Sequence, residues 1–298
     1  MSPIKEPCHF STEVRPENFT PAMRSDALRA EGETLRYLYG SVEEVRTGGI
    51  VRRWENYLQL FSAARGQRAI GEASVGYLVS PHAPAGIAQR IPHAKIMMVL
   101  RSPADRAFSH YLHCISCGLI RCSFRNYVIA ARRNKDERLG VHYPFLSMGF
   151  YAEQIRRYLE HFTRGQLGIW IYEETLQSQG EFLREVFRFL GVDDAFEPVC
   201  CERHHEPRVP RVMGVSKPLH WARMTRFCRE QLPAPLRASI RNILYRPNRQ
   251  VRMKAVDRAM LLDIYRADIG ALEEILGRKL DIWLNDSSIV NAQKQAPP

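Results

Sequence analysis

KIMMVLRSPADRAFSHY, residues 95–111, is the stretch of sequence that decides the fold. Its first part, Lys95–Arg101, is a continuous apolar run that ends at a turn signal, as expected for a parallel strand covered on both faces. Pro103 then stands where a first-turn proline belongs, and it predicts a helix that runs through Phe108 and Leu112. A strand that turns directly into a helix favours a parallel α/β sheet.

Further strands and helices alternate on both sides of this stretch. Two more apolar runs are predicted strands, and four runs with apolar residues at helical spacing are predicted helices. The strands are Arg68–Ala73 and Leu167–Tyr172, and the helices are Ile50–Ala64, Tyr151–Phe162, Glu181–Leu190 (closed by Gly191) and Met260–Leu276 (closed by Gly277). The pattern predicts one α/β domain over residues 1–284, with a polar, disordered tail at 285–298.

The turn after the first strand has the chemistry of an anion site. It combines Arg101, the free backbone N–H groups of a helix N-terminus, and Ser109 two turns into the helix. A helix N-terminus attracts a phosphate, and a guanidinium can bind one through two parallel hydrogen bonds. The residues alone leave a second interpretation open, a strand-to-helix turn with incidental arginines.

The same stretch resembles the 3′-phosphate-binding motif of sulfotransferases that use 3′-phosphoadenosine 5′-phosphosulfate (PAPS), in which a strand is followed by R-x-P-x-x-R-x-x-S-x-Y. The matching positions are Arg101, Pro103, Arg106, Ser109 and Tyr111. The resemblance implies that Arg101 and Ser109 hold the donor's 3′-phosphate and that Arg106 is structural. It also implies a P-loop-NTPase-like fold, a parallel sheet flanked by helices.

Five other segments resemble this family in the same order along the chain. They are MSPIKEPCHFS (1–11), GEASVGYL (71–78), GFYAEQIRRYLEHF (149–162), FRFLGV (187–192) and ADIGALEEILGRKLDIWL (267–284). The first is similar to the K-E-P stretch of heparan-sulfate-type and bacterial carbohydrate sulfotransferases, which implies that Glu6 is the catalytic base and that Lys5 is its neighbour in the site. The second implies that Glu72 and Ser74 approach the acceptor, although Ala73 stands where some relatives have lysine.

Other interpretations of these residues stay open. Without the resemblance, Glu6 is better explained as part of a surface ion pair near the chain terminus. His9 and His113 are alternative bases, although a lone histidine is more often structural. The C-x-x-C formed by Cys114 and Cys117 has no second pair to complete a zinc site, so no metal is expected.

Positive charge is concentrated in one segment. The chain has a net charge of +11, and residues 203–258 hold 14 Lys and Arg against three acidic residues, which accounts for the whole excess. Such a segment favours an anionic partner, although a solvated basic face without a partner is an alternative. Within it, Arg208 and Arg211 are candidate contacts to the donor's 3′-phosphate or the acceptor by position and charge.

Cysteine content and hydropathy bear on the compartment. Seven irregularly spaced cysteines, an odd number, favour reduced thiols. No apolar run reaches the roughly 18 residues of a spanning helix, so no transmembrane segment is expected. Residues 1–10 lack the apolar core of a signal peptide, and a cytoplasmic location is expected.

One part of the family's sequence has no counterpart here. Its members begin with a strand and a K-[ST/A]-G-T-[ST] loop for the 5′-phosphosulfate, whereas Met1 already lies at the K-E-P stretch. We therefore expect this N-terminal strand and phosphate loop to be missing, which leaves neighbouring strands with bare edges and an uncovered apolar layer. Our preferred explanation is a start that lies upstream; the alternative is a degenerate relative.

Three functions follow, in order of preference. The first is a PAPS-dependent O-sulfotransferase acting on a carbohydrate or similar hydroxyl acceptor. The second is a truncated, non-catalytic relative that retains only 3′-phosphoadenosine binding. The third and least expected is a basic protein that binds nucleic acid or a membrane surface, with Trp221, Phe227 and Tyr245 among the arginines of residues 203–258.

Overall fold

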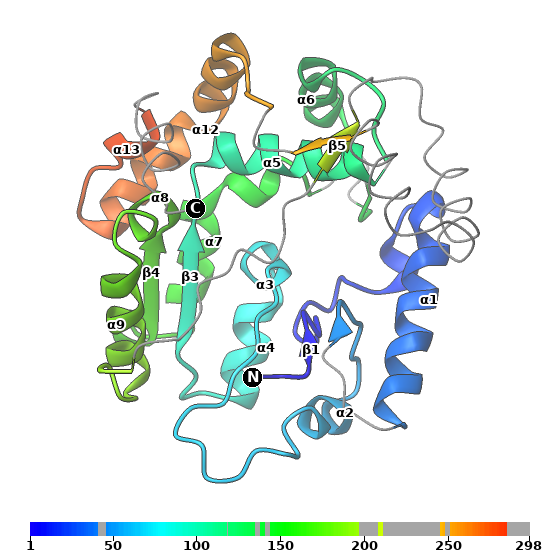
Figure 1. The fold of residues 1–298 in the computed structure, drawn as a ribbon, viewed down its shortest axis with the longest axis vertical. Coiled ribbons are helices and arrows are strands. Elements are labelled where there is room, and N and C mark those ends of the chain that lie inside the picture. Colours follow the sequence, from blue (N-terminus) through cyan, green and yellow to red (C-terminus); the bar gives the residue numbers. More distant parts are fainter. Residues whose placement is uncertain are drawn as a thin grey trace.

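Two pairs of parallel strands carry the described part of the fold (Figure 1). The computed structural model describes residues 1–40, 46–117, 119–134, 138–140, 144–196, 208–210, 245–247 and 251–284. The longer pair joins β3 (Ile96–Leu100) to β4 (Leu167–Ile171) over five residues each. The shorter pair joins β1 (Ile4–Lys5) to β2 (Arg46–Thr47). A third pair, β5 (Arg208–Pro210) and β6 (Tyr245–Pro247), is antiparallel.

Helices pack around these strands. Their bounds are α1 (Pro21–Leu38), α2 (Trp54–Gln59), α3 (Gly76–Val79), α4 (Ala83–Arg90), α5 (Pro103–Ser116), α6 (Phe124–Arg133), α7 (Tyr151–Leu159), α8 (Tyr172–Thr175), α9 (Gln179–Leu190), α12 (Ala255–Leu276) and α13 (Asp281–Leu284), with 3₁₀ turns at Pro16–Asn18, Ser147–Gly149 and Arg164–Gln166. In Figure 1, α9 flanks β4, α1 flanks the β1–β2 pair, and α3 and α4 stand between β3 and β1. None of the helices described is long and apolar enough to cross a membrane.

The central strand and most of the predicted helices are confirmed. β3 and β4 occupy the two apolar runs, and they pair in parallel as expected. Pro103 begins α5, and α9 and α12 end where predicted, with Gly191 (φ 75°) and Gly277 (φ 66°) in the left-handed region that glycine adopts without steric cost. The mixed α/β class that the pattern predicted is therefore correct.

Three local predictions were wrong. Residues 68–73 form no strand; two isolated backbone hydrogen bonds, from Ser2 N to Gly71 O and from Glu6 N to Ala73 O (both 3.0 Å), run beside them without a ladder. The helix predicted over 50–64 is confined to α2, because the backbone tightens into i→i−3 bonds from Leu60 onward.

The third correction concerns the covering of β3. Its apolar run predicts burial on both faces, yet Met97 and Val99 are 50% and 49% exposed while Met98 and Leu100 are buried. Among the residues described, β4 is the one strand that pairs with β3, and the side chains at 97 and 99 share a face. The exposed side chains of Met97 and Val99 therefore contradict the prediction that β3 is covered on both faces.

A buried polar network holds α12 and α13 against the start of α5. Arg258 in α12 donates from Nη1 to both carboxylate oxygens of Asp105 (2.8 and 2.9 Å) and from Nη2 to the carbonyl of Trp283 (2.9 Å). Glu173, buried after β4, accepts from the Ser102 backbone N–H and from Trp283 Nε1, both at 2.9 Å. These bonds fix the turn that follows β3, because they anchor its backbone to two other elements.

Candidate functional site

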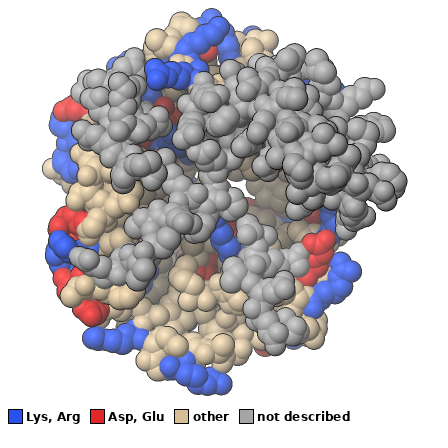
Figure 2. Space-filling view, viewed as in Figure 1, with Lys and Arg blue, Asp and Glu red and all other residues tan. Residues whose placement is uncertain are grey.

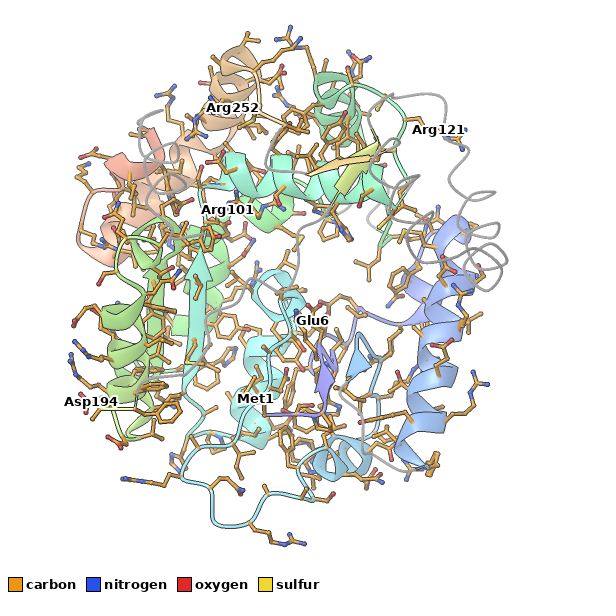
Figure 3. All side chains as sticks on the ribbon, viewed as in Figure 1. Met1, Glu6, Arg101, Arg121, Asp194 and Arg252 are labelled. Carbon is orange, nitrogen blue, oxygen red and sulfur yellow. The ribbon has the colours of Figure 1, made fainter. Side chains whose placement is uncertain are left out.

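Predicted site residues lie at the carboxyl ends of β1 and β3. Glu6 directly follows β1, and Arg101 directly follows β3. The two strands point the same way in Figure 1, and Figure 3 shows both labelled residues at that end of their strands. Parallel sheets bind their ligands beyond this edge, and each of the two residues follows that end of its own strand pair.

Glu6 is held in an unusual backbone conformation. Its φ is 62°, and Cys8 has φ 51°, which non-glycine residues seldom adopt. Backbone bonds fix the segment from both sides: Glu6 N–H donates to Ala73 O (3.0 Å), and Gly49 N–H donates to Glu6 O (3.1 Å). The side chain of Glu6 is half-buried and that of Lys5 is exposed, and within the described ranges neither side chain makes a hydrogen bond or an ion pair. A strained, firmly held residue with an uncommitted carboxylate is typical of a functional position.

Glu72 and Ser74 lie beside Glu6. Ser74 Oγ donates to Glu72 Oε2 (2.9 Å) and accepts from the Cys8 backbone N–H (3.2 Å). The hydroxyls of Tyr57 and Tyr77 lie against the same Glu72 carboxylate. Burial raises the pKa of Glu72, and the charge of nearby Glu6 adds to the rise. The two carboxylates therefore share one neighbourhood, and the two tyrosines in it were not predicted.

The thiol in this neighbourhood is that of Cys8, and its surroundings disfavour the reactive thiolate. Burial, with the nearby charges of Glu6 and Glu72, raises the pKa of Cys8 to about 12. A thiol that stays protonated at neutral pH reacts slowly, because the thiolate is the reactive form. Carboxylates and hydroxyls are therefore the groups that this cluster offers to a ligand.

Replacing Glu72 with glutamine is expected to remove one pH-dependent contribution to stability. Because burial raises its pKa, the folded protein binds this proton more tightly than the unfolded chain does. The contribution is complete below pH 4.5, the group's ordinary pKa, and it is lost as pH rises through the raised pKa of the folded state. Urea unfolding between pH 4 and 8 should therefore show wild type losing stability relative to Glu72→Gln as pH rises. A constant difference would contradict the assignment, and exposed Glu153→Gln serves as the control.

The donor-side residues flank the first two turns of α5. The Arg101 guanidinium lies 5.4 Å from the ring centre of Tyr172. The backbone carbonyl of Arg101 accepts a hydrogen bond from the Tyr151 hydroxyl (3.0 Å). Within the described ranges, neither the Arg101 nor the Ser109 side chain has a hydrogen bond or an ion pair. No hydrogen bond joins the two side chains among the residues described. Both side chains are half-buried and are thus partly accessible to a ligand.

Arg106, in contrast, is committed to the fold. Its Nη2 donates to the Phe145 carbonyl (2.6 Å), and its guanidinium lies 5.8 Å from the Phe145 ring centre. Arg106 thereby ties α5 to the segment before α7, the structural role that the resemblance implied.

The remaining predicted residues are only partly accounted for. Arg208 belongs to β5, although only its backbone is described, and Arg211 lies outside the described residues. The basic segment 203–258 is described only at 208–210, 245–247 and 251–258, and the tail 285–298 lies outside the description.

His9 and His113 are the two alternative bases, and their surroundings differ. His9 Nδ1 lies 2.9 Å from Val51 O, its ring stacks on Tyr57 at 4.7 Å, and burial lowers its pKa. His113 Nε2 lies 3.7 Å from Cys117 Sγ at the far end of α5. His9 is thus packed against neighbouring residues, whereas His113 is exposed, and neither is among the groups that contact the Glu72 carboxylate.

Comparisons with known proteins find similarity to sulfotransferases. The family model described as "Sulfotransferase domain" matches residues 57–205. Human bifunctional heparan sulfate N-deacetylase/N-sulfotransferase 3 is 34% identical over 124 residues, 41% of this chain and 14% of that protein. The N-deacetylase/N-sulfotransferase 1 of Caenorhabditis elegans is 29% identical over 132 residues, 43% of this chain and 15% of that protein.

A solved structure is similar over nearly the whole chain. The sulfotransferase from Alicyclobacillus acidocaldarius superposes with a TM-score of 0.65 at 26% identity, covering 95% of this chain and 87% of that one. The curated relatives are much longer, and the chain matches only about a seventh of their length.

Proposed function

This chain belongs to the sulfotransferase family, and on that basis we propose that it transfers a sulfuryl group from PAPS to a hydroxyl of a carbohydrate acceptor. The observation that carries the proposal is the pair of uncommitted charged side chains, Glu6 and Arg101, at the carboxyl ends of β1 and β3. One can take a proton and the other can bind a phosphate.

On the donor side, Arg101 and Ser109 hold the 3′-phosphate of PAPS. Arg101 stands two residues before α5, and Ser109 lies in the second turn of that helix. The long arginine side chain is proposed to reach the anion that the Ser109 hydroxyl binds. The guanidinium has no carboxylate partner among the residues described, which leaves its donors available. Arg208 and Arg211 are proposed as further contacts to the donor by their charge.

On the acceptor side, Glu6 takes the proton of the attacking hydroxyl. The acceptor oxygen bonds to sulfur as the bond between sulfur and the donor's phosphate oxygen breaks, and 3′,5′-ADP leaves. Charge spreads over the sulfuryl oxygens in such a transfer, so a cation such as Lys5 is useful nearby. Glu72 and Ser74 stand beside Glu6 and are proposed to orient the acceptor.

The nature of the attacking atom separates two versions of this function. The relatives named above carry an N-sulfotransferase activity, and a carboxylate base can take the proton that either a hydroxyl or an amine loses when it is sulfated. An oligosaccharide with N-acetylated glucosamine and one with free amines, otherwise identical, distinguish the two. Sulfuryl transfer to both indicates a hydroxyl acceptor, and transfer to the free amines alone indicates an amine.

The donor site is tested by nucleotide binding. Arg101→Ala and Ser109→Ala are each expected to weaken 3′,5′-ADP binding by about 1–3 kcal/mol, the scale of a hydrogen bond to a charged group. Isothermal titration calorimetry measures this, with Arg266→Ala, an exposed arginine on α12, as the control. Unchanged affinity in both variants would refute the donor site. Binding without any transfer would indicate the non-catalytic relative instead.

A further inference from the structure

Two cysteines and a histidine gather at the carboxyl end of α5, and the proposed function uses none of them. Cys114 and Cys117 form a C-x-x-C, and Cys117 caps the end of the helix. His113 Nε2 lies 3.7 Å from Cys117 Sγ. The part of the chain that the structure describes contains no group of three His, Cys, Asp or Glu side chains that could hold a metal ion. Two thiols with an imidazole beside them can instead carry redox chemistry.

The two cysteines differ in their access to solvent. Cys117 is exposed, whereas Cys114 is buried and only 4% exposed. Burial, with the charge of nearby Cys117, raises the pKa of Cys114 to about 11. Cys114 therefore stays protonated at neutral pH, and a molecule that arrives from solution meets Cys117 first. An accessible thiol beside a second, sheltered one is the arrangement of an attacking and a resolving cysteine.

The imidazole of His113 is placed to activate Cys117. A thiol is a weak hydrogen-bond donor, and a neutral imidazole has one nitrogen that can accept the proton. The atoms in contact are the reactive ones, His113 Nε2 and Cys117 Sγ. Both residues are exposed, so a reactant from solution can reach the sulfur while the base stays beside it. A neighbouring base of this kind activates a cysteine as a nucleophile.

The helix holds the two cysteines almost close enough for a disulfide. The N–H of Cys117 donates to His113 O (2.9 Å), and the N–H of Leu119 donates to Cys114 O (2.8 Å), so the last turn is regular. Residues three apart on such a turn have Cβ atoms about 5–6 Å apart, against about 3.5–4.5 Å in a disulfide. Closing the bond therefore requires the two residues to approach by about 1–2 Å, and the position of Cys117 at the helix end makes that movement easier. The resulting disulfide is strained and easily reduced.

We propose that Cys117 is a thiol-modification site that reacts with a small disulfide such as glutathione disulfide, and that Cys114 then displaces the bound thiol. In the first step the sulfur of Cys117 bonds to one sulfur of the small disulfide, whose own sulfur–sulfur bond breaks. His113 takes the proton of Cys117 and passes it to the thiolate that leaves. In the second step the sulfur of Cys114 loses its proton and attacks the sulfur of Cys117, and the second small thiol leaves with that proton. Two protein thiols are thereby oxidised to one disulfide, and the small disulfide is reduced to two thiols.

Peptide mass spectrometry tests the proposal on the full chain. The folded protein is mixed with glutathione disulfide at neutral pH, samples are alkylated at intervals, and trypsin digestion follows without reductant. Trypsin releases both cysteines in one peptide, residues 107–121, whereas Cys122 begins the next. In wild type we expect a glutathione adduct on Cys117 first, and then the same peptide lighter by two hydrogen atoms than its reduced form. Cys114→Ala should accumulate the adduct, and Cys117→Ser should form neither product.

The role of His113 is tested by the rate of the first step. His113→Gln is expected to slow formation of the adduct about tenfold or more, a modest share of what a positioned base can contribute. His161→Gln is the matched control, because His161 is also an exposed histidine, and it should react like wild type. Equal rates in all three proteins would remove His113 from the proposal.

The remaining outcomes separate this site from general thiol reactivity. Glutathione spread evenly over the cysteines of the folded chain, or a disulfide that joins Cys117 to Cys122, would overturn the proposal. An adduct that persists in wild type without a disulfide would overturn the role of Cys114. If the buried substitution Cys114→Ala prevents folding, the wild-type time course decides alone, because the adduct must appear before the disulfide. In urea the preference for Cys117 should disappear, since it depends on the folded end of α5.

Discussion

Sulfuryl transfer by the Glu6→Gln variant is expected to fall by about 100-fold or more, the lower end of what a general base contributes, while 3′,5′-ADP binding stays unchanged. Glutamine has nearly the shape of glutamate and keeps an acceptor oxygen, but it cannot take the proton of the acceptor hydroxyl. Glu6 adopts a φ of 62°, and glutamine at this position must adopt the same backbone conformation. The two proteins therefore differ only in whether the side chain can carry a negative charge.

The measurement is transfer of radiolabelled sulfuryl from PAPS to a glycan, with nucleotide affinity determined in parallel. Glu55→Gln is a suitable control, because this glutamate is exposed at the start of α2 and pairs only with Arg53 among the residues described. Equal activity of wild type and Glu6→Gln would exclude Glu6 as the base. The neighbouring carboxylate, Glu72, would then be the group to test.

Removing Arg258 is expected to have the largest effect on stability. Its side chain is 9% exposed and that of Asp105 is 12% exposed, so Arg258→Ala leaves a carboxylate buried without its partner. Breaking one side of a buried ion pair costs about 3–5 kcal/mol in the free energy of unfolding. The variant also loses the bond to the Trp283 carbonyl, which helps to hold α13 in place.

Urea unfolding measures this loss, and Arg266→Ala on the same helix is the matched control. Arg266 pairs with Asp263 at a fully hydrated surface, where both side chains are 76% exposed, and such pairs contribute little. Nucleotide binding should also weaken in Arg258→Ala, because Asp105 lies in the first turn of the helix that carries Ser109. A loss below about 1 kcal/mol would show that the pair is not a structural anchor.

The parts of the fold that the sequence predicted are those with a strong local signal. An apolar run followed by proline specifies β3 and α5, and a glycine after an amphipathic run specifies the ends of α9 and α12. α1 was not predicted, because charged residues interrupt the apolar ones in its sequence, PAMRSDALRAEGETLRYL, and the helix buries few side chains. Helices of this kind are stabilised mainly by tertiary packing, which cannot be predicted from a short segment of sequence.

The residues of the candidate site also fall into two groups, those that a motif predicted and those that only the structure shows. Glu6, Glu72 and Ser74 were found through motifs, and the structure brings them into one neighbourhood. Tyr57 and Tyr77 were missed as site residues, because Tyr57 was assigned to the apolar face of a helix and nothing local shows that its hydroxyl meets Glu72.

Two adjacent methionines on β3, Met97 and Met98, are expected to oxidise at very different rates, because they lie on opposite faces of the strand. Met97 is 50% exposed and Met98 is 5% exposed, so peroxide should convert the first thioether to its sulfoxide long before the second. On the face drawn in Figure 2, uncharged surface lies between groups of Lys, Arg, Asp and Glu side chains. Oxidation of Met97 therefore reports solvent access to the exposed face of β3, and oxidation of Met98 reports opening of the core.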